Sequence, residues 1–224
     1  MAADSLTLRL RRILTSYIEP PLKSLGFRRR GANYFRQLSE IWWLVSVQRS
    51  RWNTKEELSF TLNIGIYVPQ ATAGLYGNQP KHPGIADCIL HLRLGYLQHP
   101  VDCWWTLCVA DAVPAAVDEA VGQEIQELLV NHGLPFLERF HTHRDVLGYF
   151  KELSAYDLRI LTFPKSAVWI FVNMGVLHWL LGEYDLCCRS LTQALNEVQR
   201  GRAYGIQDFV ESVFYRLCKE YEQK

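Results

Sequence analysis

The spacing of apolar residues changes once along this chain of 224 residues, and that change constrains the fold more than any other feature. Between residues 27 and 109, short apolar runs alternate with polar or glycine-containing turns, as in the strands of an antiparallel sheet. From Pro114 onward, apolar residues recur at three- and four-residue intervals, which indicates helices. An amphipathic helix is expected over residues 5–25. We therefore predict an α+β fold, in which an antiparallel sheet of about five or six strands has one N-terminal helix and several C-terminal helices.

The same patterns predict where the elements lie. In the first helix, Arg9, Arg11 and Arg12 fall outside the apolar stripe, and Pro20-Pro21 should bend or end it. Residues 69–84 are rich in glycine and proline, and we expect a long loop there. Strands are expected as two short runs within 27–38 and at 41–51, 58–68, 89–97 and 104–109. The later helices are expected from Pro114, within 134–144, and at 167–181, 184–198 and 207–221.

Two regions follow from this layout. Residues 1–145 are expected to form the α+β domain, and residues 146–224 a helical extension packed on it. Within the extension, the expected hairpin turned at Gly182 carries Gly175, Leu181-Gly182-Glu183-Tyr184 and Ala194-Leu195, and with these residues it loosely resembles one tetratricopeptide repeat. A single repeat cannot bury its own apolar face, so we expect it to pack on the domain.

Composition narrows the class of protein. The chain is 49% hydrophobic and 21% charged, which argues against disorder and is sufficient for a hydrophobic core. No apolar run approaches the ~18 residues that a membrane span requires, and no secretory signal pattern begins the chain. The six cysteines form no CxxC pair and are expected to be small buried hydrophobic residues. These features favour a soluble, cytoplasmic protein with no membrane association.

Charge is unevenly distributed. The first 55 residues contain 11 Lys or Arg and 3 acids, a net charge of +8; since the whole chain carries +1, the other 169 residues carry −7. Such asymmetry can mark an anion-binding surface, or two parts of one fold that pair with each other.

The strand pattern also indicates a candidate binding surface. Side chains alternate between the two faces of a strand, and polar residues share one face of each strand expected at 41–51 and 58–68. If these strands pair as a hairpin, their polar faces coincide. The alternative is an ordinary solvent-exposed face. The candidate ligand-binding residues are Gln48, Asn63 and Arg93 on the face, with Arg28, Arg30 and Arg36 at its rim.

No motif of a serine hydrolase, nucleotide-binding loop, dinucleotide fold or zinc protease is present, so no catalytic residue is assigned. The loosely spaced His82, Cys88 and His91 and the pair His141 and His143 are weak metal signals, and no metal or cofactor is expected. The leading hypothesis is a non-catalytic protein that holds a protein partner or a small anionic ligand. Nucleic-acid binding through the basic segment, where arginines adjoin aromatic residues, is one alternative. A hydrolase with a site assembled in space is the other.

Several stretches together resemble a known family. The first stretch is Leu22–Gly31, where an expected helix ends in a leucine-glycine-phenylalanine corner followed by basic residues. The stretches that follow, in chain order, are the expected strand segments Tyr34–Arg36, Val45–Ser50, Phe60–Ile66 and His91–Gly95, then Trp104-Trp105 and Leu134–Leu137. In this order they resemble the domain of unknown function 4304 over roughly residues 6–145. The resemblance implies an α+β domain of prokaryotic type with no assigned activity, and it transfers no catalytic residues.

Overall fold

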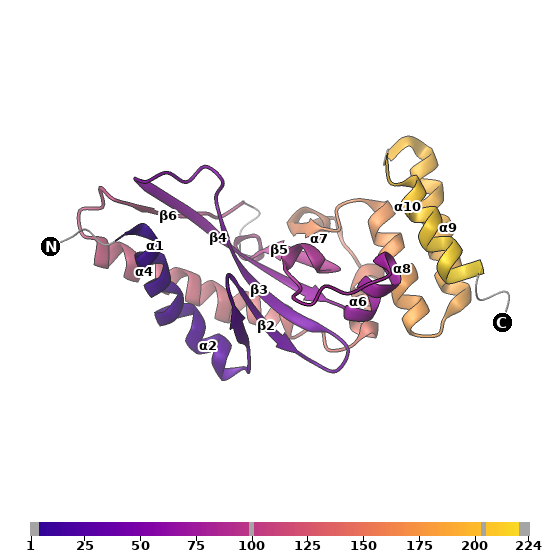
Figure 1. Cartoon of the computed structure of the whole chain (residues 1–224), viewed down its shortest axis with the longest axis horizontal. Helices are drawn as coiled ribbons and strands as arrows, with labels where there is room; N and C mark the ends of the chain where they lie inside the picture. Colours follow the sequence, from indigo (N-terminus) through magenta and orange to yellow (C-terminus); the bar gives the residue numbers. More distant parts are fainter. Residues whose placement is uncertain (1–4, 99–100, 203–204, 220–224) are drawn as a thin grey trace. The chain divides into compact units, whose positions relative to one another are not determined.

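The computed structural model describes residues 5–98, 101–202 and 205–219 and has the predicted α+β fold (Figure 1). The described strands form a seven-stranded sheet in the order β1-β2-β3-β4-β5-β7, with β6 paired antiparallel to β4. The strands are β1 (Arg28–Arg30), β2 (Asn33–Gln37), β3 (Trp42–Arg49), β4 (Glu57–Tyr67), β5 (Leu90–Arg93), β6 (Trp105–Cys108) and β7 (Leu161–Phe163). The α-helices are α1 (Leu6–Ile13), α2 (Glu19–Ser24), α3 (Pro69–Tyr76), α4 (Pro114–Leu128), α5 (Leu134–Leu137), α6 (His143–Lys151), α7 (Ala155–Ile160), α8 (Ala167–Leu180), α9 (Tyr184–Glu197) and α10 (Gln207–Phe214).

The described residues divide into two compact units. Unit 1 takes its residues from Met1–Gln37, Trp43–Gly65 and Leu92–Arg139; unit 2 takes them from Leu38–Trp42, Ile66–His91 and Phe140–Lys224. The boundary after residue 145 stays a prediction. Residues 220–221 of the last expected helix lie outside the described part of the chain.

The N-terminal helix begins at a serine cap and runs past its two prolines. The Ser5 hydroxyl accepts the Leu8 N–H at 3.3 Å, which satisfies one of the unpaired amides of the first turn. A π-helical turn, η1 (Leu14–Ile18), joins α1 to α2. Pro20 and Pro21 lie in the first turn of α2, directly after this π-helical turn, and prolines and π-helical turns are features at which helices bend. The helix ends at Ser24 rather than at the prolines.

Arg9 is buried, contrary to the amphipathic pattern, which places it outside the apolar stripe. Only 2% of its surface is exposed. Its Nε and Nη2 donate to the Asp118 and Asp111 carboxylates, each at 2.8 Å, and its Nη1 donates to the Cys108 carbonyl at 2.7 Å. The helix can bury this cation because both acids meet it inside unit 1. Part of the basic N-terminal segment thus pairs with the acidic remainder of the chain.

Helix α4 packs closely against the N-terminal helix of unit 1. Gly122 permits this approach, because a Cβ at that position would overlap the Tyr17 ring. By contrast, a Cβ at Gly148 in α6 would meet no atom within 4 Å.

The expected loop over 69–84 is wrong for its first half, which is helix α3. Pro69 occupies the first helical position, where its fixed φ fits, and Gly77 ends the helix with φ at 78°. The proline and the glycine thus mark the two ends of a helix. Ala71 and Leu75 are buried where α3 packs on α8 within unit 2.

Strand β7 was not predicted. The sequence around Phe163 indicates only a break between helices, because three residues are too few to show an alternating pattern. Pairing with β5 makes them a strand, and the Phe163 ring stacks on His91 at 6.0 Å. Burial lowers the pKa of His91 to about 4.

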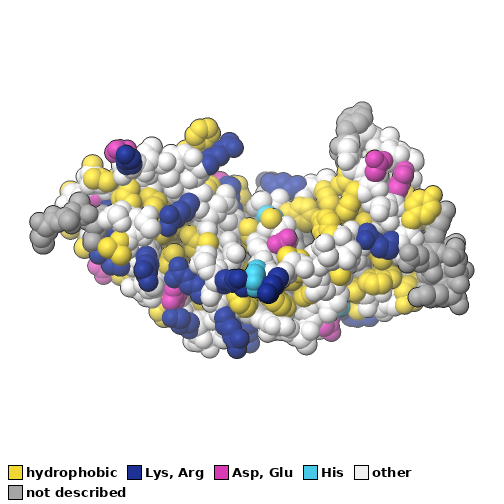
Figure 2. Space-filling view, viewed as in Figure 1, with side chains coloured by type: hydrophobic (Ala, Val, Ile, Leu, Met, Phe, Trp, Pro, Cys, Tyr) yellow, Lys and Arg dark blue, Asp and Glu magenta, His cyan; other side chains and the backbone are white. Residues whose placement is uncertain are grey.

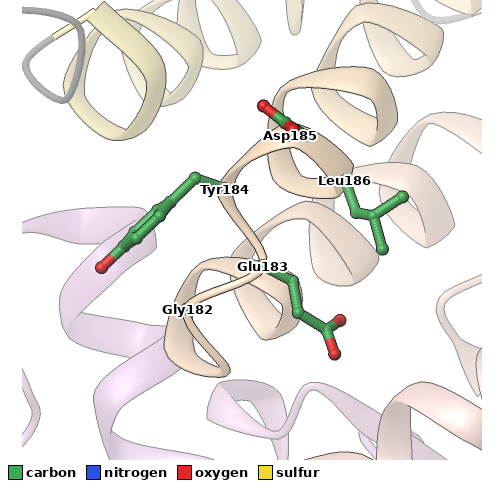
Figure 3. Close-up of a pocket in the computed structure, with 5 residues that line it drawn as sticks. All are labelled: Gly182, Glu183, Tyr184, Asp185 and Leu186. Atoms are coloured by element: carbon green, nitrogen blue, oxygen red, sulfur yellow. The ribbon is translucent and has the colours of Figure 1, made fainter.

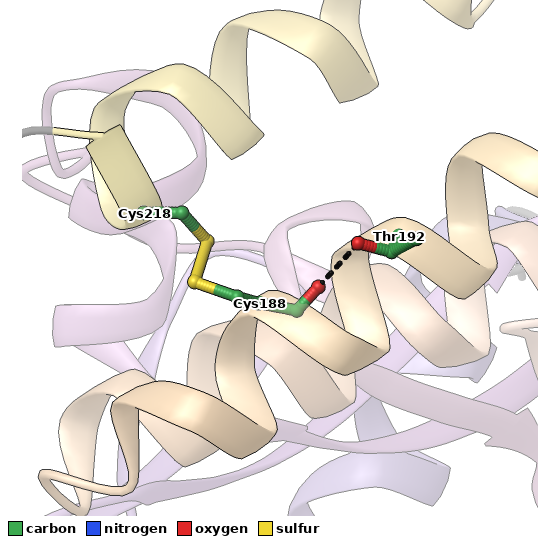
Figure 4. The surroundings of a disulfide bond; sticks show 3 residues. All are labelled: Cys188, Thr192 and Cys218. Carbon is green, nitrogen blue, oxygen red and sulfur yellow. Dashed lines mark hydrogen bonds between the residues drawn. A yellow bond between two sulfur atoms is a disulfide. The ribbon is translucent and has the colours of Figure 1, made fainter. Parts of the chain in front are cut away.

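The helical hairpin α8–α9 forms as predicted and turns at Gly182, whose φ is 74°. The state of two cysteines in this region differs from the prediction. Cys188 in α9 and Cys218, in the π-helical turn after α10, form a disulfide with Cα atoms 5.7 Å apart (Figure 4). The expectation that every cysteine is a free buried residue is therefore wrong for this pair. No helix in the described ranges is both long and apolar enough to cross a membrane.

Candidate functional site

The first hairpin of the sheet decides where its arginines lie. In the antiparallel register of β1 and β2, Arg28 lies opposite Phe35 and Arg30 opposite Asn33. Residues directly opposite one another project from the same face. Arg28 and Arg30 therefore share one face of the sheet, and both are exposed.

The next pairing continues this face onto β3. The Val47 N–H donates to the Ala32 carbonyl at 2.9 Å, which sets Asn33 opposite Ser46. Because side chains alternate, Gln48 lies on the same face as Ser46. Two tight turns thus bring Arg28 and Arg30 of β1 onto the face of the sheet that carries Gln48.

Gln48 and Asn63 make the central contact of this polar sheet face, which we define as Arg28, Arg30, Gln48 and Asn63. The Asn63 Nδ2 donates to the Gln48 Oε1 at 3.0 Å. Asn63 is only 2% exposed, whereas Gln48 is exposed. The buried amide therefore orients the exposed one. Since Gln48 uses its oxygen in this bond, its NH₂ group remains as an exposed donor.

Arg36 lies on the opposite face of the sheet. Its guanidinium carbon is 4.9 Å from the centre of the ring of Trp43, which is buried and contacts Phe27 at 6.3 Å. On the same face, Arg29 lies over Tyr34 and pairs with Glu19 of α2. The structure therefore separates Arg36 from the other candidate residues.

Arg93 lies in a cluster of its own at the end of β5. It pairs with Asp102, and its guanidinium carbon lies 5.0 Å from the centre of the Trp104 ring. The Trp104 Nε1 donates to the same carboxylate at 2.9 Å. Nearby, the Thr61 hydroxyl of β4 donates to the Cys103 carbonyl at 2.9 Å. The segment before β6 thus covers part of β4 and neutralises Arg93.

One exposed feature was missed from the sequence. Trp52, in the turn between β3 and β4, is 77% exposed. The Arg51 guanidinium carbon lies 4.9 Å from the centre of a Trp52 ring. On the face that Figure 2 shows, Lys and Arg side chains gather over the region of α2, β2 and β3. The predicted strands at 41–51 and 58–68 place Trp52 in the turn between them, and the adjacent cation and tryptophan were the available signal.

The predicted histidine signals do not assemble into a metal site: among the described residues, no group of three or more His, Cys, Asp or Glu could hold an ion. Instead, the backbone N–H of His143 donates to the Glu40 carboxylate at 2.8 Å, and the Cys88 thiol donates to the Gly84 carbonyl at 3.7 Å. Burial raises the pKa of all four free thiols, which disfavours the thiolate that a cysteine nucleophile requires. These thiols are Cys88, Cys103, Cys108 and Cys187.

A hollow at the α8–α9 turn, lined by residues 182–186, brings no chemistry together. Figure 3 shows Tyr184, Asp185 and Leu186 projecting in different directions. Glu183 is already engaged, since His178 Nδ1 lies 2.6 Å from its carboxylate and Arg144 lies at 3.3 Å. The hydrogen bond with His178 is the main cause that lowers the pKa of Glu183. The turn is therefore a structural ion-pair cluster.

Comparison with known protein families gives one match. The family described as Domain of unknown function (DUF4304) matches residues 18–139, which is more than half of the chain. Comparisons with curated proteins and with solved structures found no significant match. The matched segment contains α2, the strands from β1 to β6 and helix α4, and hence the polar sheet face. The chain thus belongs to the DUF4304 family, within the stretch that the sequence motifs indicate.

Proposed function

We propose that this protein is a binding protein whose polar sheet face holds an anionic group, carried by a protein partner or by a small molecule. The observation that carries the proposal is the Asn63–Gln48 hydrogen bond, which orients an exposed NH₂ donor on the face that bears Arg28 and Arg30. Guanidinium and amide NH₂ groups offer only donors. Such a set complements carboxylate or phosphate oxygens, which only accept.

The spacing of the donors suits a group larger than one ion. β1 and β3 are separated by β2, so their backbones lie about 10 Å apart. Along the strands, Arg30 is level with Ser46 and Arg28 with Leu44, so the donors are spread along the face and Arg30 is the nearer of the two to Gln48. Arg36 and Arg93 are left outside the proposed contact set, because one lies over Trp43 and the other is paired with Asp102.

Titration of the full chain with pyrophosphate and with a poly-glutamate peptide, at low salt, tests the proposal. We expect Gln48→Ala to weaken binding about tenfold, the loss of one charge-assisted hydrogen bond, and the double variant Arg28→Ala/Arg30→Ala, which removes two, to weaken it about a hundredfold. Arg11→Ala, which removes an exposed charge from helix α1, is the control and should bind as the wild type does. Absence of binding by the wild type, or equal affinity of all variants, would overturn the proposal.

A second candidate function rests on the exposed Trp52 and its stacked Arg51. An aromatic side chain beside cations is the platform on which single-stranded nucleic acid stacks. Binding to a short oligonucleotide should then fall steeply as salt rises, and Trp52→Ala should weaken it. Retention of affinity in that variant would remove this candidate.

We also propose a cytoplasmic location in a prokaryotic cell. The four free thiols support it, whereas the Cys188–Cys218 disulfide argues for an oxidising environment. Isolation of the protein under thiol-trapping conditions would decide between the two.

A further inference from the structure

Unit 2 contains a second site, which is unrelated to the polar sheet face. A cavity of about 140 Å³ lies among α3, the segment before β5, β7 and α8. Its mouth is lined by Tyr76 and Asp87, both exposed, and its walls include Phe163 and Trp169. Asn173 of α8 lines it and is only 1% exposed. The volume is that of a small organic group, too small for a nucleotide.

Asn173, which lines this cavity, has an unused acceptor. Its Nδ2 donates to the Ile89 carbonyl at 3.3 Å, whereas its Oδ1 is buried and has no hydrogen-bond partner among the described residues. Buried carbonyl oxygens are nearly always paired in proteins. A ligand that brings an N–H donor into the cavity would satisfy this atom.

The walls and the mouth favour a positive charge. The Phe163 and Trp169 rings meet edge to face with centres 5.4 Å apart, and Tyr76 adds a third ring. Aromatic faces attract ammonium groups. Asp87 supplies a carboxylate, one oxygen of which accepts the Gly84 N–H at 2.7 Å. None of the described residues that line the cavity is Lys or Arg, and Arg216 is engaged with the backbone, since its Nη2 donates to the Leu75 carbonyl at 2.8 Å.

The electrostatics of the neighbouring tyrosine agree with this assignment. Burial raises the pKa of Tyr76, and the charge of Asp87 raises it further. The negative field of Asp87 therefore reaches the cavity wall, where it would favour a bound cation.

We propose that this cavity binds a primary or secondary ammonium group, carried by a small alkylamine or by a lysine side chain. One N–H is donated to the Asn173 Oδ1, the alkyl part lies against Phe163 and Trp169, and Asp87 balances the charge at the mouth. The N–H requirement excludes quaternary ammonium ions, and the charge requirement excludes neutral amides.

Calorimetric titration of the full chain tests the proposal with n-butylammonium, tetramethylammonium and butyramide. We expect n-butylammonium to bind and the other two to bind at least about tenfold more weakly, since each lacks one of the two interactions. Equal affinity for tetramethylammonium would refute the role of Asn173, and equal affinity for butyramide would refute the role of charge. Absence of n-butylammonium binding would refute the site. Nα-acetyl-lysine methylamide, titrated in parallel, distinguishes a free amine from a lysine side chain.

Two variants with the same change of charge localise the binding. Asp87→Asn keeps an oxygen that can accept the Gly84 N–H but removes the negative charge, and we expect it to weaken n-butylammonium binding several-fold. Asp185→Asn makes the same change in the exposed first turn of α9 and should bind as the wild type does. Equal affinities of the two variants would overturn the proposal. Because both positions are exposed, neither substitution should prevent folding.

Discussion

Replacement of Arg9 by methionine should be among the most destabilising single changes in unit 1. Methionine keeps the apolar stem but removes the guanidinium, which donates to Asp111, Asp118 and the Cys108 carbonyl. Two of these hydrogen bonds join opposite charges, and each such bond contributes about 1.5–3 kcal/mol. Loss of one partner from a buried ion pair independently suggests about 3–5 kcal/mol. Because the two carboxylates are slightly exposed and can recover some hydration, we expect a loss of about 3 kcal/mol in the free energy of unfolding.

Urea denaturation, followed by tryptophan fluorescence, measures this loss. In thermal unfolding it corresponds to a decrease in Tm of roughly 10 °C for a chain of this size. Arg11→Met is the matched control, because Arg11 lies on the same helix and is exposed; its effect should stay within about 0.5 kcal/mol. An Arg9→Met protein within about 1 kcal/mol of that control would refute the reasoning.

The pH dependence separates a stranded charge from a simple packing defect. In the wild type, burial alone would raise the pKa of Asp111, but hydrogen bonds from Arg9 and from the Cys108 N–H hold it below its ordinary value. Its contribution to stability is therefore present above the unfolded-state pKa and is lost as pH falls. Without Arg9, burial should raise that pKa instead. The difference in the free energy of unfolding between the wild type and Arg9→Met should then shrink as pH falls from 7 to 4. A difference that stays constant would indicate lost packing alone.

Three further predictions concern other parts of the chain. Gly122→Ala should lower the free energy of unfolding by about 1–3 kcal/mol, because the added methyl group overlaps the packed Tyr17 ring, whereas Gly148→Ala should raise it by up to about 1 kcal/mol. Urea denaturation measures both effects, and equal effects would contradict the close packing of α4. The pKa of His91 is about 4 in the folded state and about 6.5 in the unfolded state, so the free energy of unfolding should fall by about 3 kcal/mol as pH decreases from 6.5 to 4. His91→Phe should flatten this dependence of stability on pH, and an unchanged dependence would show that His91 does not cause it. A thiol assay should detect four thiols in denatured, unreduced protein and six after reduction, and six before reduction would exclude the Cys188–Cys218 disulfide. With 30 residues between its cysteines, this disulfide should stabilise the fold by about 3–4 kcal/mol in the chain-entropy description.

Much of the candidate site was predictable from sequence, because period-two alternation is a local property of strands. It places Gln48 and Asn63 on coincident faces once β3 and β4 pair, and their hydrogen bond confirms that they meet. The side of the sheet on which an arginine lies depends on register, which Arg36 illustrates: it lies over Trp43 on the face opposite Arg28. Sequence also could not reveal that Asp102 would neutralise Arg93.

The sequence by itself determined the fold class, the order of most strands and helices, and the turn at Gly182, since these follow from local spacing and from backbone conformations that few residues adopt. Only the tertiary structure decided the burial of Arg9, the strand at β7 and the cavity around Asn173. Each of these depends on partners that are distant in sequence: Asp111 and Asp118 for the arginine, β5 for the short strand, and Ile89 for the asparagine. A charged or three-residue segment carries no local signal of such partners, because its conformation becomes favourable only when they are packed against it.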